Sequence, residues 1–127
     1  MVEGSATIST YDVFVRRYTA SASVRGIASM IEGADQQNLM TLWIFFYEPE
    51  AYASVSLGSL DPQAKVLTVN LPLSDFGDTY HVLQTEKPVW IWYLYDEQDF
   101  TILVFQIGTK YNEPVGEGFT DLTALTS

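Results

Sequence analysis

The sequence predicts a mostly β domain, an antiparallel sandwich or barrel of six or seven strands with one short helix. Two observations support this fold class. Several segments either alternate apolar and polar residues or form short β-branched and aromatic runs, and turn-forming residues separate them. Only one segment combines a helical apolar stripe with signals for the helix ends. An α+β fold, in which two helices cover an antiparallel sheet, is the alternative.

Two segments in the first quarter of the chain are expected to be strands. Thr10–Tyr18 alternates, with Phe14 on its more polar side, which is typical of a strand with one buried face. Ser21–Glu32 fits either a strand or a helical stripe, but Gly26 in its middle would cost a helix about 1 kcal/mol relative to alanine. We therefore favour a strand there, followed by a polar connection over residues 34–38.

The middle of the chain predicts one long strand and a hairpin. Leu39–Glu48 is apolar on both faces and is stopped by Pro49. Ala51–Leu57 and Lys65–Leu71 both alternate, and a turn signal at residues 58–62 separates them. These two segments predict a half-exposed antiparallel hairpin.

The predicted helix covers Asp75–Thr85. Ser74 or Asp75 can cap it, and Pro88 disfavours its continuation. Its expected inner face consists of Phe76, Tyr80 and Leu83.

Pro88–Tyr95 and Phe100–Gly108 predict a second hairpin, closed by residues 96–99. With these four residues in the loop, Tyr93 would lie opposite Ile102. Residues 109–127 show no periodicity, and we expect them to form a strap or tail of a single domain that spans residues 1–127.

The charge balance limits the partners. Six basic and sixteen acidic residues give a formal net charge of −10 at pH 7. Nucleic acid and anionic membrane are disfavoured, whereas a basic protein or a small neutral or cationic ligand is electrostatically allowed. No signal peptide or membrane-spanning run is visible, so we expect a soluble protein.

Strands that are apolar on both faces provide the candidate site. One face of a strand in a small antiparallel domain usually meets water, yet the runs around Trp43 and Trp90 carry large side chains on both faces. Each side chain left in water would lose roughly 1.5–3 kcal/mol. We therefore expect a cover, which is the helix, the C-terminal strap, a second subunit or a ligand. The candidate ligand or interface residues are Trp43, Phe45, Tyr47, Trp90, Trp92, Tyr93, Tyr95 and Phe105.

Catalytic and metal chemistry have less support. His81 is the only histidine and is expected to be exposed, together with Asp78, on the outer side of the helix. The chain has no cysteine, so disulfides and thiolate metal sites are excluded. Carboxylates that could bind a hard cation are better explained as turn and cap residues. They are Asp75 and Asp78, the acids of the 96–99 turn, and Glu113, Glu117 and Asp121. We predict no metal and no cofactor.

The leading hypothesis is a non-catalytic binding or assembly module. Its aromatic strand faces would serve self-association or an apolar or carbohydrate ligand, because tyrosine and tryptophan rings stack on sugars while nearby acids bind their hydroxyls. Capture of a quaternary amine by rings flanked with carboxylates is a variant. The alternatives are an acidic inhibitor or mimic that docks on a basic protein, and a small β-barrel enzyme with an apolar pocket.

Overall fold

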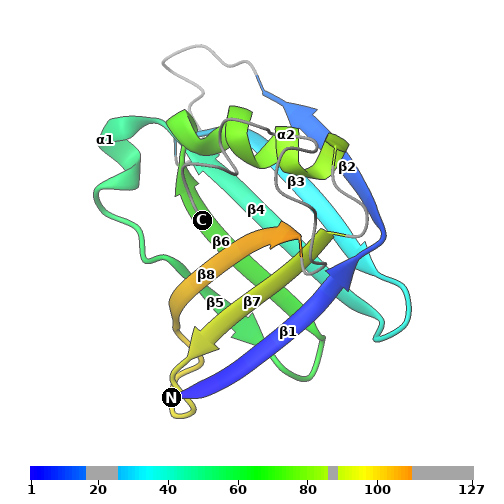
Figure 1. Ribbon diagram of the computed structural model, residues 1–127. Helices are drawn as coiled ribbons and strands as arrows, with labels where there is room; N and C mark the ends of the chain where they lie inside the picture. The colour runs from blue at the N-terminus through cyan, green and yellow to red at the C-terminus, as the bar shows by residue number, and fades with distance from the viewer. Residues whose placement is uncertain (17–25, 86–88, 110–127) are drawn as a thin grey trace, which may run out of the picture.

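Two β-sheets stack on each other in the computed structural model, which describes residues 1–16, 26–85 and 89–109 (Figure 1). The predicted mostly β sandwich with one short helix is confirmed. The three-stranded sheet has the order β1 (Val2–Ile8), β7 (Val89–Tyr95), β8 (Ile102–Thr109). The five-stranded sheet has the order β2 (Thr10–Val15), β3 (Ile27–Asp35), β4 (Met40–Tyr47), β6 (Val66–Pro72), β5 (Gly58–Asp61). The described chain thus has eight strands rather than six or seven. The predicted antiparallel pairing holds for the other strand pairs, but β4 and β6 run parallel.

The hydrophobic core lies between the two sheets. Successive strand residues point to opposite faces, so every second residue of β4 points inward, and Leu42, Ile44 and Phe46 are at most 1% exposed. Neighbouring strands and the opposite sheet contribute Ile31, Leu67, Val69, Ile91 and Tyr93 to the same cluster. This layer supplies the main apolar burial of the fold.

The two sheets are joined along both sides. β1 continues into β2 through Ser9, whose amide donates to the carbonyl of Ala34 at 2.9 Å, so one stretch of chain passes from one sheet to the other. On the opposite side, Ser59 and Thr101 form an isolated bridge between the β5 and β8 ends. The sheets are therefore held at a set spacing, and their outer faces point away from each other.

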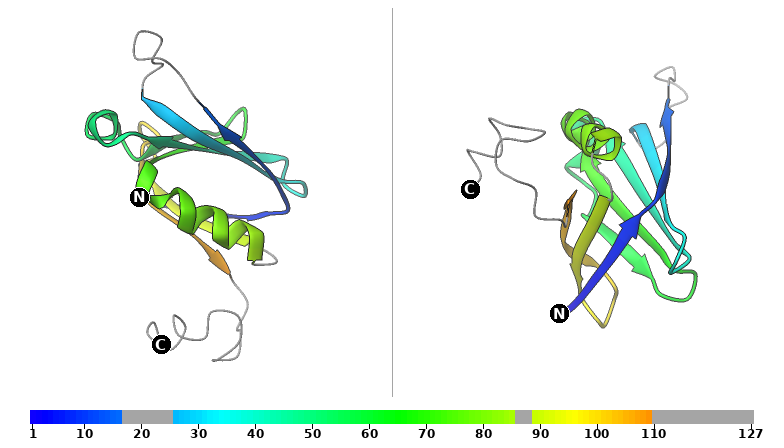
Figure 2. Two further views of the ribbon diagram at one scale, coloured as in Figure 1. Left: turned by 90° about the horizontal axis from the view of Figure 1, so that it is seen from above. Right: turned by 45° about the vertical axis from the view of Figure 1, so that its right-hand side comes forward.

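The predicted helix is present as α2 (Phe76–Thr85), which begins one residue later than expected. A short 3-10 turn, η2 (Leu73–Asp75), which the sequence did not predict, precedes it. Its Phe76 ring lies 5.0 Å from Phe46, and its Tyr80 ring lies 6.3 Å from Tyr11. Figure 2 (left) shows α2 on the side of the five-stranded sheet that faces β7 and β8. The helix therefore covers the inner side of that sheet and leaves the outer side open. No helix in the described ranges is long and apolar enough to cross a membrane.

Three hairpins share one kind of turn. The turns after Asp35, Asp61 and Asp96 all have glutamine two residues later, and in each the aspartate Oδ1 accepts the glutamine amide at 2.8–3.1 Å. The last turn residue in each has positive φ: 55° at Leu39, 58° at Lys65 and 59° at Phe100. The aspartate side chain replaces a backbone partner and a left-handed residue closes the turn.

This turn explains why the predicted register of the β7–β8 hairpin is wrong. The loop consists of residues 97–100 rather than 96–99, because the Asp96 amide donates to the Thr101 carbonyl at 3.0 Å. A bulge then follows between Leu94 and Tyr95. As a result Tyr93 pairs with Phe105 instead of Ile102.

The predicted strand over Ala51–Leu57 is also wrong. Pro49 begins a short helix, α1 (Pro49–Tyr52), where its missing N–H costs nothing. The strand that pairs with β6 is β5, which occupies residues predicted as a turn. The local alternation of apolar and polar residues over Ala51–Leu57 therefore does not produce a strand, because β5 takes the pairing position beside β6.

The predicted strand over Ser21–Glu32 is found in part. The strand interpretation is confirmed over Ile27–Glu32, but β3 continues to Asp35, so the connection to β4 is shorter than expected. The start of that segment, at residues 21–25, and the predicted strap at residues 110–127 lie outside the described residues.

We expect Gly58→Ala to destabilise the protein by about 1–3 kcal/mol. Gly58 has φ 154°, and a Cβ there would overlap the carbonyl oxygen of Thr68. Gly77→Ala is the control, because its Cβ would meet nothing within 4 Å and alanine favours a helix. Urea unfolding should show a lower free energy of unfolding for Gly58→Ala and a higher one for Gly77→Ala. An equal change in the two variants would contradict the β5–β6 geometry.

Asp35 should make stability depend on acid pH. Burial acts to raise the pKa of Asp35, but hydrogen bonds from Asn38, Thr7 and Gln37 outweigh it and lower the pKa below 3.8. The stabilisation is therefore present above pH 3.8 and is lost as the pH falls through the folded-state pKa. We expect Asp35→Asn to lower the free energy of unfolding by about 1–3 kcal/mol at neutral pH and by much less near pH 2.

Urea unfolding of both proteins at the two pH values measures this difference. Asp61 lies in an exposed turn and accepts two backbone hydrogen bonds. Asp61→Asn should therefore lower the free energy of unfolding at neutral pH by less than Asp35→Asn does. An equal loss at both pH values would mean that the charge of Asp35 contributes nothing.

Candidate functional site

The eight predicted site residues do not form one site. Trp43 and Phe45 lie on the outer face of the five-stranded sheet, and Trp90 and Trp92 lie on the outer face of the three-stranded sheet. The other four are in or beside the core: Tyr47, Tyr93, Tyr95 and Phe105. Tyr93 is only 4% exposed, so it cannot offer its ring to a ligand in this conformation.

Trp43 and Phe45 belong to a row of stacked rings that also contains Phe14. The Trp43 ring lies 5.8 Å from Phe45 at an interplanar angle of 10°, and 6.3 Å from Phe14 at 28°. Phe14 is on β2 and Trp43 is on β4, so the two rings meet across β3. Phe14 remains 41% exposed. We call Phe14, Met30, Trp43 and Phe45 the outer aromatic face.

Charged residues lie at the two ends of this face. Asp12 and Glu32 are directly opposite on β2 and β3, and Glu32 is in turn opposite Trp43. At the other end, Arg16 Nη2 lies 3.8 Å from the Sδ of Met30. The five strands of this sheet contain four acidic residues and no lysine or arginine.

One border of the outer aromatic face is covered by the chain itself. Asn70, opposite Phe45 on β6, donates from its side chain to the Ser56 carbonyl at 3.0 Å and from its amide to the Leu57 carbonyl at 2.7 Å. The segment after α1 therefore runs along this edge. It leaves the Phe14–Trp43 part of the face open.

The outer face of the three-stranded sheet is built differently. Trp92 donates its indole N–H to Glu3 Oε1 at 2.7 Å, which ties the ring to β1. Next to it, Leu103 and Val104 are 45% and 40% exposed.

The catalytic and metal candidates remain dispersed. His81 and Asp78 are exposed on α2, as expected. Asp96 and Asp99 accept backbone amides of their own turn at 2.8 and 2.9 Å, which is the turn role predicted for them. Within residues 1–16, 26–85 and 89–109, no group of three acids or histidines is placed to hold a metal. Glu113, Glu117 and Asp121 lie outside the described residues.

Comparison with family models, curated proteins and solved structures finds no match to this chain. The candidate site is therefore argued from geometry alone.

Sequence reasoning missed Phe14, Met30, Asp12 and Glu32 as members of the site. The alternation of residues 10–18 did place Phe14 on the polar side of its strand, which is an unusual position for a phenylalanine. What could not be read from the sequence was the register that brings β2 and β3 beside Trp43.

Phe14→Ala should expose Trp43 without unfolding the protein. We expect the NMR resonance of the Trp43 indole N–H to shift and its exchange with water to increase, because a stacked ring is removed. The free energy of unfolding should change by less than about 1 kcal/mol. Val15→Ala, at a residue 61% exposed and on the other side of β2, should leave the indole signal unchanged. An unchanged signal in Phe14→Ala would disprove the stack.

Proposed function

We propose that this domain is a non-catalytic binding module that docks a segment of a basic partner protein on the outer aromatic face. The segment places an apolar or aromatic side chain on the Phe14–Trp43–Phe45 stack and a lysine or arginine against Asp12 and Glu32. The observation that carries this proposal is the open ring stack beside two carboxylates on the same face.

The ring stack supports the apolar part of the contact. Phe14 is 41% exposed, and the stacked Trp43 and Phe45 rings beside it are half-buried. Aromatic residues dominate the energetic centre of many protein interfaces, because they bury much area with few rotatable bonds. A partner side chain seated here would remove that exposed surface from water.

The two carboxylates support the basic part of the contact. Like charges directly opposite each other on neighbouring antiparallel strands destabilise a sheet, so the Asp12–Glu32 pair is unfavourable for folding alone. A cation placed between them would relieve the repulsion and could also approach the face of Trp43. The five strands contain no lysine or arginine, and Arg16, directly after β2, holds its Nη2 against the Met30 sulfur at the opposite end of the face.

The same charges favour a basic partner over a second copy of this chain. Two copies, each with a formal charge of −10, repel each other at long range. Self-association through the outer aromatic face is nevertheless one outcome that the experiment detects.

The test uses a synthetic peptide that alternates lysine and leucine, titrated into the isotope-labelled protein. We expect shifts of the Trp43 indole N–H and of the β2 and β3 amides, and weaker binding at higher salt. Asp12→Asn and Glu32→Gln should each weaken binding about three- to tenfold. In the free protein the same substitutions should slightly raise the free energy of unfolding, because they remove the repulsion.

Two controls make the result specific. A peptide that alternates glutamate and leucine should not bind, and Asp61→Asn, at the exposed β5–β6 turn, should bind the lysine peptide like the parent protein. The proposal is refuted if the affinity for the lysine peptide is unchanged by Asp12→Asn, by Glu32→Gln and by added salt. Sedimentation of the free protein as a dimer that Phe14→Ala dissociates would show self-association instead.

A further inference from the structure

One edge of β8 is not paired with any strand in the part of the chain that the structure describes. β8 is the last strand of the three-stranded sheet (Figure 1), and beside β7 it has only the Ser59–Thr101 bridge at its start. Leu103 has no partner on β7, so residues 104–109 form the regular part of the strand. Every second residue of an edge strand points its backbone N–H and C=O away from the sheet. Residues 104–109 therefore offer a row of donors and acceptors to a further strand.

β8 lacks the usual protection of an edge strand. Charged residues, proline or a short length normally keep such strands from pairing with another chain. The other three edge strands follow this rule: β1 contains Glu3, β2 contains Asp12, and β5 has four residues and ends at Asp61. β8 has eight residues, none of them charged and none of them proline, and its Val104 is 40% exposed. An unprotected edge of this kind is suited to strand addition by a partner.

A groove lies beside this edge. It is a cavity of about 260 Å³ between β8 on one side and β6, η2 and α2 on the other, and its apolar lining residues are Leu71, Val82, Phe105 and Ile107. Phe105 and Ile107 are on the inner face of β8, where they pack against the core. A strand added about 4.8 Å from β8 would point every second side chain toward the same inner side. Those side chains would enter the groove.

The rim of the groove is acidic. Asp75 and Asp78 line the same cavity, and both are exposed. The surrounding elements η2, α2 and β8 contain no lysine or arginine to pair with these carboxylates. A partner segment that carries a lysine or arginine next to apolar residues therefore matches the groove in charge.

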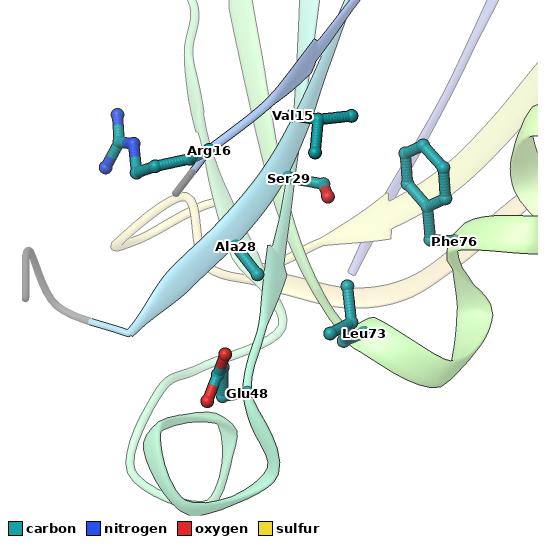
Figure 3. Close-up of a pocket in the computed structure, with 7 residues that line it drawn as sticks. All are labelled: Val15, Arg16, Ala28, Ser29, Glu48, Leu73 and Phe76. Carbon is teal, nitrogen blue, oxygen red and sulfur yellow. The ribbon is translucent and has the colours of Figure 1, made fainter. Parts of the chain in front are cut away.

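A larger cavity, of about 360 Å³, lies beside Leu73 and Phe76 at the ends of β2 and β3 (Figure 3). Its two charged side chains, Arg16 and Glu48, lie apart in this view, and the Arg16 guanidinium points away from Phe76. Its charged groups therefore do not converge on one ligand. The groove beside β8 differs, because an unpaired backbone edge, an apolar lining and two carboxylates adjoin the same space.

We infer that β8 takes up an extended segment of a partner protein as an added strand in the groove between β8 and α2. The backbone of residues 104–109 pairs with the segment, and every second side chain of the segment, an apolar one, lies in the groove. A lysine or arginine of the segment lies near Asp75 or Asp78. In this mode of binding, main-chain hydrogen bonds supply affinity and the contacts of alternate side chains supply selectivity. The inference does not depend on the proposed function, because it uses no residue of the outer aromatic face.

The experiment begins with the free full chain. Hydrogen exchange followed by NMR should alternate over residues 104–109, because amides that face β7 are hydrogen-bonded and amides that face outward are open to water. Slow exchange at all of these amides would mean that the edge is already occupied, and would overturn the inference. If the protein then also sediments as a dimer, the occupant is a second copy of the chain.

The next step titrates a blocked peptide that alternates valine and threonine and has a lysine at each end into the isotope-labelled chain. We expect shifts of the amides of Val82, Phe105 and Ile107, and slower exchange of the outward amides of β8. The Trp43 indole N–H should not shift. The same peptide with glutamate at each end should bind about three- to tenfold more weakly.

Backbone methylation of the peptide separates strand addition from binding through side chains alone. Methyl groups on every second amide nitrogen remove the N–H donors of one edge of the peptide and leave the other edge intact. Of two peptides methylated at odd or at even positions, one should bind about tenfold more weakly than the unmethylated peptide, and the other should stay within about threefold of it. Equal affinity of the two methylated peptides would overturn the inference.

Two variants test the acidic rim. Asp75→Asn and Asp78→Asn remove the charge but keep a side chain that suits the start of a helix, so each should weaken binding of the lysine peptide about threefold. Asp61→Asn, in the exposed β5–β6 turn, is the matched control and should bind like the parent protein. The inference is overturned if neither rim variant weakens binding. Shifts confined to the Trp43 indole and the β2 amides would also overturn it, and would leave the proposed function intact.

Discussion

The packing of β4 at the centre of the five-stranded sheet determines the rest of the structure. Its inward row, Leu42, Ile44 and Phe46, has almost no exposure and contacts the opposite sheet and α2. Because strand side chains alternate with a period of two, filling that side places Trp43 and Phe45 on the other. The fold thus buries the inward row of β4 completely, whereas the outward residues Trp43 and Phe45 are covered only by side chains and chain segments on the same outer face.

That second row is stabilised by contacts among its own rings. Stacking of Phe14, Trp43 and Phe45 shields part of each ring, and the segment after α1 shields the β6 edge. What remains open is a limited apolar area next to carboxylates, which suits a partner better than it suits bulk water. The helix could not serve as the cover, because the sandwich places it on the inner side.

The sequence alone determined the fold class, a helix ending at Thr85 and a long central strand that is apolar on both faces, because each follows from local periodicity and end signals. It also contained the three Asp-x-Gln turns, whose chemistry is local. It could not determine that β5 rather than Ala51–Leu57 pairs with β6, nor the register that brings Phe14 to Trp43, because these depend on contacts between distant segments. Only the tertiary structure decided which aromatic residues are core and which are surface, since either face of a two-sided strand can turn inward until its partners are in place.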